Sequence, residues 1–65
     1  MGIQPGCQYA FTEDYGPIES GTHVYCVGIK DGYAFFHLRQ SLFGASQLKL
    51  KLCEDLHMSL RFIYS

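Results

Sequence analysis

Asp31 and Gly32 stand together between two stretches rich in Val, Tyr, Phe and Ile, within residues 22–38. Both residue types tolerate the positive φ angle that a type I′ turn needs at its two central positions, and this turn has the same twist as a pair of antiparallel strands. The pair therefore predicts a tight β-hairpin. Because the turn also fixes which residues face each other, it constrains the fold more than any other sequence feature.

The register of the hairpin follows from the turn. Counting outward, Lys30 faces Tyr33 and Cys26 faces His37, and side chains alternate between the two faces of the strands. One face is apolar apart from a phenol, so we expect it to be the core, while the other carries aromatic rings and is expected to be half solvated. The predicted core face comprises Tyr25, Val27, Ile29, Ala34, Phe36 and Leu38, and the predicted outer face comprises Cys26, Gly28, Lys30, Tyr33, Phe35 and His37.

The remaining segments predict three further strands. Residues 47–52 alternate strictly between polar residues and leucine, which is typical of a half-buried strand. The C-terminal residues fit either a helix or a strand, and we favour a short helical turn over residues 54–58 followed by a strand over residues 60–64. The other expected segments are an irregular and frayed lead-in over residues 1–7, a strand over 8–12, a long loop over 13–21 and an irregular connection over 39–46.

Five short strands predict a single all-β domain over residues 1–65. A flat sheet of this size would leave both edges open and one face uncovered, so the strands are expected to curl into a closed or half-closed barrel. We therefore predict a small five-stranded, partly open barrel with a short helical turn near the C-terminus. A five-stranded barrel of the oligonucleotide-binding type is the competing architecture.

The order of these elements resembles the Src-homology-3-like small β-barrel, and the resemblance covers most of the chain. It rests on the aromatic first strand within residues 9–15, the entry to the second strand at Gly21, Thr22 and Val24, the aromatic strand after Asp31 and Gly32, and the acidic turn Glu54-Asp55-Leu56 before the last strand. The resemblance implies the fold alone. The branch of this family that binds proline-rich peptides places a tryptophan in its groove, and the chain contains none.

The chain carries more apolar surface than a domain of its size can bury. Its 65 residues are 48% hydrophobic and 15% aromatic but only 17% charged, against about 25% charged residues in an average soluble domain. A domain this small is only marginally stable, because a short chain buries a small share of its surface. The surplus apolar surface predicts a homo-oligomer or a permanent protein partner.

We expect the protein to be soluble and cytoplasmic. Residues 1–6 lack the basic start of a secretory signal, and no stretch approaches the ~20 apolar residues of a membrane-spanning helix, so no membrane association is predicted. The three cysteines are odd in number and irregularly spaced, which predicts free thiols rather than a disulfide framework. The formal net charge of −1 gives the molecule as a whole no strong attraction for polyanions.

Cysteine and histidine residues form two constellations that bear on chemistry. His23 with Cys26, and Cys53 with His57, carry the thiols and imidazoles that zinc prefers. However, residues three apart on a strand point to opposite faces, and neither pair has a glycine-rich turn. The predicted pair of Cys26 and His37 lacks a third, orienting residue. We therefore predict no metal, no cofactor and no catalytic residues.

The predicted function is non-enzymatic binding of a macromolecule. Exposed aromatic rings with lysine at the rim are typical of protein interfaces, so a protein partner is expected first. Its predicted contacts are Tyr33, Phe35, His37 and Lys30, with Tyr15 in the acidic loop. The same chemistry suits a single-stranded nucleic acid, whose bases stack on aromatic rings and whose phosphates pair with lysines. The residues of this alternative are Lys30, Tyr33, Phe35, Lys49 and Lys51.

Overall fold

The computed structural model describes residues 2–38 and 46–64, and across them the chain folds into one antiparallel sheet and one short helix. The elements in chain order are β1 (Gln8–Phe11), β2 (His23–Lys30), β3 (Tyr33–Leu38), β4 (Ser46–Lys51), α1 (Glu54–Ser59) and β5 (Leu60–Tyr64). Their order in the sheet is β4-β3-β2-β1-β5, so the sheet is open and β4 and β5 are its edges. The predicted all-β class, with five strands and a short helix near the C-terminus, is confirmed.

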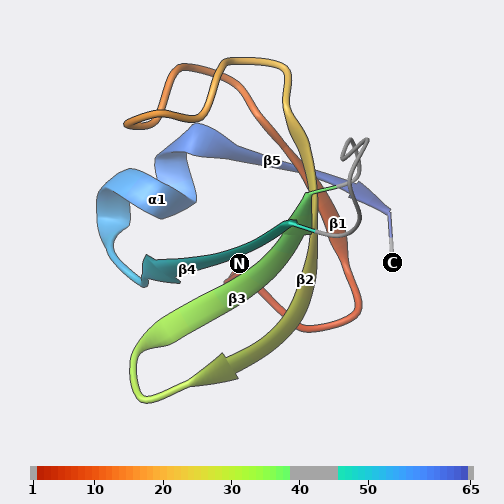
Figure 1. The fold of residues 1–65 in the computed structure, drawn as a ribbon, viewed down its shortest axis with the longest axis vertical. Helices are drawn as coiled ribbons and strands as arrows, with labels where there is room; N and C mark the ends of the chain where they lie inside the picture. Colours follow the sequence, from red (N-terminus) through yellow and green to blue (C-terminus); the bar gives the residue numbers. More distant parts are fainter. Residues whose placement is uncertain (1, 39–45, 65) are drawn as a thin grey trace.

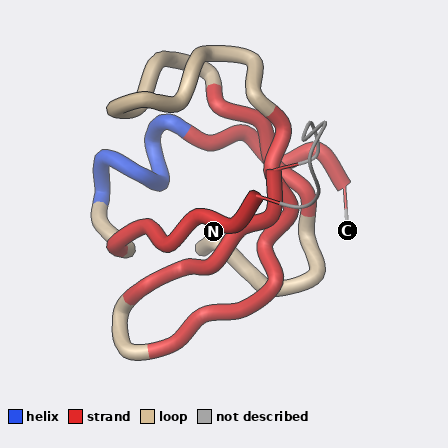
Figure 2. Tube along the Cα trace, in the orientation of Figure 1, coloured by secondary structure: helices blue, strands red, loops and turns tan. Residues whose placement is uncertain are grey.

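The sheet is strongly curved, and α1 leads from β4 to β5 on its hollow side (Figure 1). The long loop between β1 and β2 extends over the same hollow side (Figure 2). The C-terminal segment forms the predicted helix followed by a strand. The predicted connection over residues 39–46 lies outside the described residues except for its last residue, which begins β4.

The hairpin turn forms as predicted. Asp31 and Gly32 have φ angles of 53° and 79°, which are the positive values that a type I′ turn requires. Next to the turn, Lys30 faces Tyr33 in the predicted register. The turn chemistry therefore decides which face of β3 each of its side chains occupies.

One inserted residue, Val27, breaks the register in the middle of β2. The ladder between β2 and β3 shifts at this residue, so that Cys26 faces Phe36 and Tyr25 faces His37. The predicted pairing of Cys26 with His37 is therefore wrong. An unpaired extra residue of this kind is a β-bulge, and it moves every side chain beyond it to the opposite face of the strand.

The bulge exchanges the two faces of β2 relative to the prediction. Tyr25 and Val27, which were expected in the core, are 43% and 39% exposed, whereas Cys26, which was expected outside, is fully buried. Ile29 lies opposite Ala34 but is also exposed, because it sits beside the turn and beyond the core. The pattern of apolar residues could not reveal the exchange, since β2 carries apolar residues on both of its faces.

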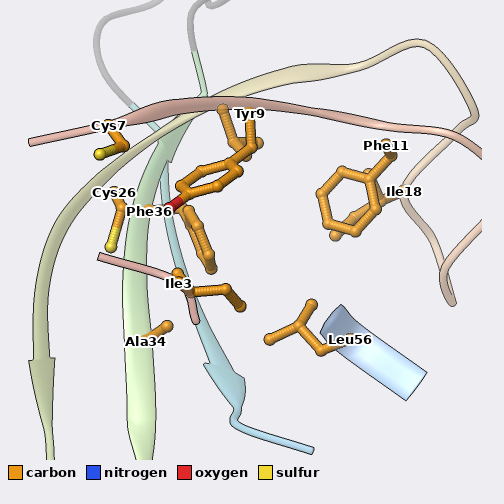
Figure 3. Close-up of a cluster of buried hydrophobic side chains, with 10 residues drawn as sticks. Ile3, Cys7, Tyr9, Phe11, Ile18, Cys26, Ala34, Phe36 and Leu56 are labelled. Carbon is orange, nitrogen blue, oxygen red and sulfur yellow. The ribbon is translucent and has the colours of Figure 1, made fainter. Parts of the chain in front are cut away.

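The core lies on the hollow side of the sheet and is closed by α1. Phe11 from β1, Phe36 from β3 and Leu56 from α1 are its largest fully buried side chains, and burial of each contributes ~1.5–3 kcal/mol. Figure 3 shows Leu56 reaching from α1 toward the sheet. The buried apolar cluster comprises Ile3, Cys7, Tyr9, Phe11, Ile18, Val24, Cys26, Ala34, Phe36 and Leu56.

The lead-in before β1 is irregular, as predicted, but it is held in place. Ile3 is buried in the core (Figure 3). Gly6 has a φ of 85°, and its N–H donates to the carbonyl of Cys26 at 2.8 Å, while the N–H of Cys26 donates to the carbonyl of Cys7 at 3.0 Å. Gly6 and Cys7 thus both face the single residue Cys26, which is the pattern of a glycine-type bulge. The predicted fraying of the first residues is wrong at Ile3.

A pair of asparagine substitutions tests the orientation of β2. Cys26→Asn places an amide in a fully buried position and is expected to lower the free energy of unfolding by about 2 kcal/mol or more. Tyr25→Asn alters an exposed residue next to it and is expected to cost less than about 1 kcal/mol. Urea unfolding followed by circular dichroism measures both values, and the opposite ranking would contradict the described orientation.

Candidate binding face of the sheet

The outer face of β2, β3 and β4 carries three rows of directly opposed residues. Side chains on this face point away from the buried core, because they alternate with Ala34 and Phe36 on β3 and with the half-buried Leu48 and Leu50 on β4. We call this surface the aromatic face. Its rows are Lys30, Tyr33 and Lys51; Gly28, Phe35 and Lys49; and Tyr25, His37 and Gln47.

The structure brings together most of the predicted contact residues on this face. Tyr33, Phe35 and His37 are each half-buried, so part of every ring is accessible. Lys49 and Lys51 are exposed on the neighbouring strand. The residues of both predicted binding functions therefore form one continuous surface, with the single exception of Tyr15.

The charges of the protein are segregated by element. The strands contain four basic residues and no acidic residue. The basic residues are Lys30, Lys49, Lys51 and Arg61. The six acidic residues lie in the loop between β1 and β2, in the hairpin turn and in α1. The aromatic face is therefore locally positive although the chain as a whole has a formal net charge of −1.

Lysine and aromatic side chains interact directly on this face. The Nζ atom of Lys49 lies 4.6 Å from the centre of the Tyr33 ring, which is within the range of a cation–π interaction. On the next row, Nε2 of Gln47 lies 3.4 Å from Nε2 of His37. The first contact places the ammonium of Lys49 over the Tyr33 ring, while the second is long for a hydrogen bond.

Gly28 leaves an open space at the centre of the aromatic face. A Cβ atom added at this position would meet no atom within 4 Å, and the φ angle of Gly28 is not positive. Neither backbone conformation nor packing therefore requires glycine here. Phe35 lies directly opposite Gly28, so no side chain of β2 stands beside it at this position.

Tyr15, the remaining predicted contact residue, lies apart from the aromatic face. Its ring packs against Phe11 with the ring centres 5.7 Å apart, and its hydroxyl lies 3.6 Å from Sγ of Cys53. Because Phe11 points into the core, the sheet separates Tyr15 from the outer face. The backbone of Tyr15 forms two hydrogen bonds with Ile18, which close a small turn inside the loop. Tyr15 therefore stabilises the loop within the domain.

The acidic residues of the same loop also have internal partners. Oδ1 of Asp14 accepts a hydrogen bond from the N–H of Ser20 at 2.8 Å, and Oε1 of Glu13 accepts one from the hydroxyl of Ser59 at 3.2 Å. Both carboxylates thus tie the loop to itself or to α1. These hydrogen bonds give Glu13 and Asp14 a structural role, while the carboxylates remain exposed and the loop remains negatively charged.

The cysteine and histidine residues do not form the constellations considered from the sequence. Within residues 2–38 and 46–64, no three side chains of the metal-ligating types gather in one place. Cys26 lies in the core while His23 is exposed on the same strand, and Nδ1 of His57 is turned to the backbone carbonyl of Cys53 at 2.8 Å. Burial raises the pKa of the Cys26 thiol above its usual value, which disfavours the reactive thiolate.

Cys53 is the exposed thiol of the chain and behaves differently from the buried ones. The backbone amide of Leu56, followed by the hydroxyl of Tyr15, lowers the pKa of Cys53 below its usual value. The three thiols should therefore differ strongly in reactivity.

Three residues of the outer surface were not identified from the sequence as a site. The sequence predicts Tyr25 in the core, and it predicts Gln8 and Tyr64 only as residues of strands. The structure places them side by side, because Gln8 of β1 faces Tyr25 on one side and Tyr64 on the other. Such contacts between distant segments leave no signal in a single sequence.

Comparison with known proteins gives no match to a family model, a curated protein or a solved structure. Within the described part of the chain, no helix has the length and apolar character needed to cross a bilayer.

Alkylation with iodoacetamide tests the description of the thiols. At neutral pH we expect one thiol of the folded chain to react quickly, because Cys53 is exposed and has a lowered pKa, while Cys7 and Cys26 react only in denaturant. Tyr15→Phe removes the phenolic hydroxyl and should slow the reaction of Cys53. Peptide mass spectrometry identifies the modified residue, and equal rates at all three cysteines would contradict the structure.

Proposed function

We propose that the protein is a non-enzymatic module that binds single-stranded nucleic acid through its aromatic face. The observation that carries the proposal is the combination, on one face, of accessible aromatic rings with lysines and without any acidic side chain. Bases present a flat apolar surface to aromatic rings, and the phosphates between them are attracted by lysine. A locally positive surface directs such a ligand to this face and away from the acidic loop.

The ring of Phe35 is the central stacking position of the proposal. It lies between Lys49 on β4 and the side-chain-free Gly28 on β2, so a base has access from the β2 side while a phosphate is within reach of the lysine side chain. Stacking of one base on an exposed ring contributes about 1–3 kcal/mol. Tyr33, held by Lys49, provides a second ring on the same strand.

The electrostatic contribution to binding is expected to be small. The aromatic face offers three lysines, Lys30, Lys49 and Lys51. For single-stranded ligands, the logarithm of the binding constant falls with the logarithm of salt concentration by about 0.7 for each phosphate neutralised. Three contacts therefore predict a slope of about −2. Affinity is then modest and depends strongly on stacking.

The fold is consistent with this proposal. β1 lies between β2 and β5, and a short helix precedes the last strand, which supports the resemblance to Src-homology-3-like barrels. A domain of this type exposes an outer sheet surface without needing an enclosed pocket. The surface residues decide the function, because one small β fold can serve many functions.

Substitution of Gly28 tests the proposed stacking surface without weakening the fold. Gly28→Thr is expected to keep or slightly raise stability, since threonine favours strands and the position is open. Its side chain covers the approach to Phe35, so affinity for a fluorescent twelve-nucleotide oligothymidylate should fall by about tenfold, as expected for the loss of one stacked base. Ile29→Thr is the matched control, because Ile29 lies on the other side of the sheet, opposite Ala34.

Fluorescence anisotropy at several salt concentrations completes this test. The unmodified protein should show a slope near −2, and Lys49→Gln should reduce its magnitude by about 0.7. Absence of binding at low salt, or equal effects of Gly28→Thr and Ile29→Thr, would refute the nucleic-acid proposal.

Self-association is a second candidate function, supported by the open edge of β5. β5 pairs with β1, and no other described strand pairs with it. Phe62 and Tyr64 on this strand are 45% and 52% exposed. A strand from a second copy of the chain would satisfy the free backbone groups of the edge and cover these rings. The protein partner predicted from the composition is, in this proposal, another copy of the protein.

Sedimentation velocity over a range of concentrations tests self-association. A dimer is expected to form as concentration rises, and Phe62→Lys should shift the protein to a monomer because a lysine on an edge strand opposes pairing. Met58→Lys is the control, since Met58 is 71% exposed on α1 rather than on the strand. A monomer at every concentration would contradict this second proposal.

A further inference from the structure

A cleft beside the aromatic face lies between two tyrosines. Tyr25 on β2 and Tyr64 on β5 occupy positions on either side of Gln8 on β1. Neighbouring strands are about 4.8 Å apart, so the two tyrosine backbones are about 10 Å apart with Gln8 between them. The cleft has a volume of about 330 Å³ and is lined by Gln8, Val24, Tyr25, His37 and Tyr64.

The walls of the cleft are aromatic and accessible. Tyr25 is 43% exposed and Tyr64 is 52% exposed, and each ring offers a flat apolar surface with a polar hydroxyl at its end. A planar ligand that enters between them can contact both. A globular or aliphatic ligand would use only part of these surfaces, so the walls favour a planar ring.

The floor of the cleft is polar. Gln8 is only 6% exposed, and its side-chain amide carries both a donor and an acceptor. Nε2 of Gln8 lies 3.5 Å from Nδ1 of His23, which is a long distance for a hydrogen bond. The amide therefore retains the capacity to bond with the edge of a ligand. Paired donor and acceptor groups are what the edge of a nucleobase presents.

The cleft is continuous with the aromatic face. Tyr25 belongs to both, and His37, which lies opposite Tyr25, is two residues from Phe35 on the same face of β3. Two residues along a strand span about 7 Å. A strand whose base stacks on Phe35 can therefore bring a further base toward the cleft.

We propose that this cleft holds one nucleobase, stacked between Tyr25 and Tyr64 with its edge on the amide of Gln8. The inference rests on the proposed function and extends it, because the aromatic face alone stacks any base whereas the cleft discriminates between bases. Binding should then show a preference for one base that depends on Gln8. The lysines and Phe35 supply affinity in this arrangement, and the cleft supplies selectivity.

Oligonucleotide binding combined with nuclear magnetic resonance tests the cleft. Twelve-nucleotide homopolymers of the four deoxynucleotides should bind the unmodified protein with unequal affinities. Gln8→Met, which keeps the size of the side chain but removes its hydrogen bonds, should bring these affinities close together. Tyr64→Leu, at an exposed edge position, should weaken the preferred homopolymer by about tenfold. Urea unfolding of both variants establishes that they remain folded.

Titration with the four nucleoside monophosphates separates the cleft from the aromatic face. The preferred nucleotide should shift the side-chain amide signals of Gln8 and the ring signals of Tyr64, while the ring signals of Phe62, which does not line the cleft, serve as the internal reference. If homopolymers bind equally and the Gln8 signals do not move, the cleft proposal is wrong although the aromatic face binds. If a monophosphate shifts the side-chain amide signals of Gln8 but no oligonucleotide binds, the cleft is a nucleotide-binding site and the proposed function of the aromatic face is wrong.

Discussion

The β-bulge at Val27 is the constraint on which the two-sided character of the sheet depends. Between the bulge and the turn, β2 keeps the register set by Asp31 and Gly32, and beyond it the strand is turned over. Cys26 thereby comes to lie in the core, and Tyr25 comes to the outer surface. Tyr25 is part of both the aromatic face and the cleft, so the cleft requires the bulge, whereas Tyr33 and Phe35 owe their face to the register set by the turn.

The distribution of charge gives this surface its direction. The charged residues in the strands are all basic, whereas the acidic residues lie in the loop between β1 and β2, in the hairpin turn and in α1. Glu13 and Asp14 are engaged in hydrogen bonds that hold the loop between β1 and β2. A nearly neutral chain can therefore present a positive and aromatic surface on one side of its sheet without the large net charge of many nucleic-acid-binding domains.

Local signals determined how much of the fold could be predicted from the sequence. The turn at Asp31 and Gly32 has its own chemistry, and the alternation of leucine and lysine in β4 marks a half-buried strand, so both were predicted correctly. The bulge has only a weak signal, because Gly28 beside it is a residue type that often marks a bulge, while Val27 itself suits a regular strand. Register beyond it depended on packing against Phe36, which the sequence does not reveal.

The part of the candidate site close to the hairpin turn could be predicted from the sequence, and the part formed by distant segments could not. Tyr33, Phe35 and Lys49 follow from alternation near the turn, and they share a face as expected. Gln8 and Tyr64 could not be found, since they meet only through the pairing of β1 with a strand from the other end of the chain. Tyr15 was placed by its loop composition, and the structure uses its ring against Phe11 instead.

Cross-strand contacts measured by nuclear Overhauser effects test the bulge, and with it the placement of Tyr25 on the outer surface, most directly. The described register predicts contacts between the backbone protons of Tyr25 and His37, and between those of Cys26 and Phe36. An uninterrupted ladder would instead place Cys26 against His37 and Val27 against Phe36. Observation of that second set would contradict the orientation of Tyr25 and Cys26 and remove the basis for the proposed cleft between Tyr25 and Tyr64.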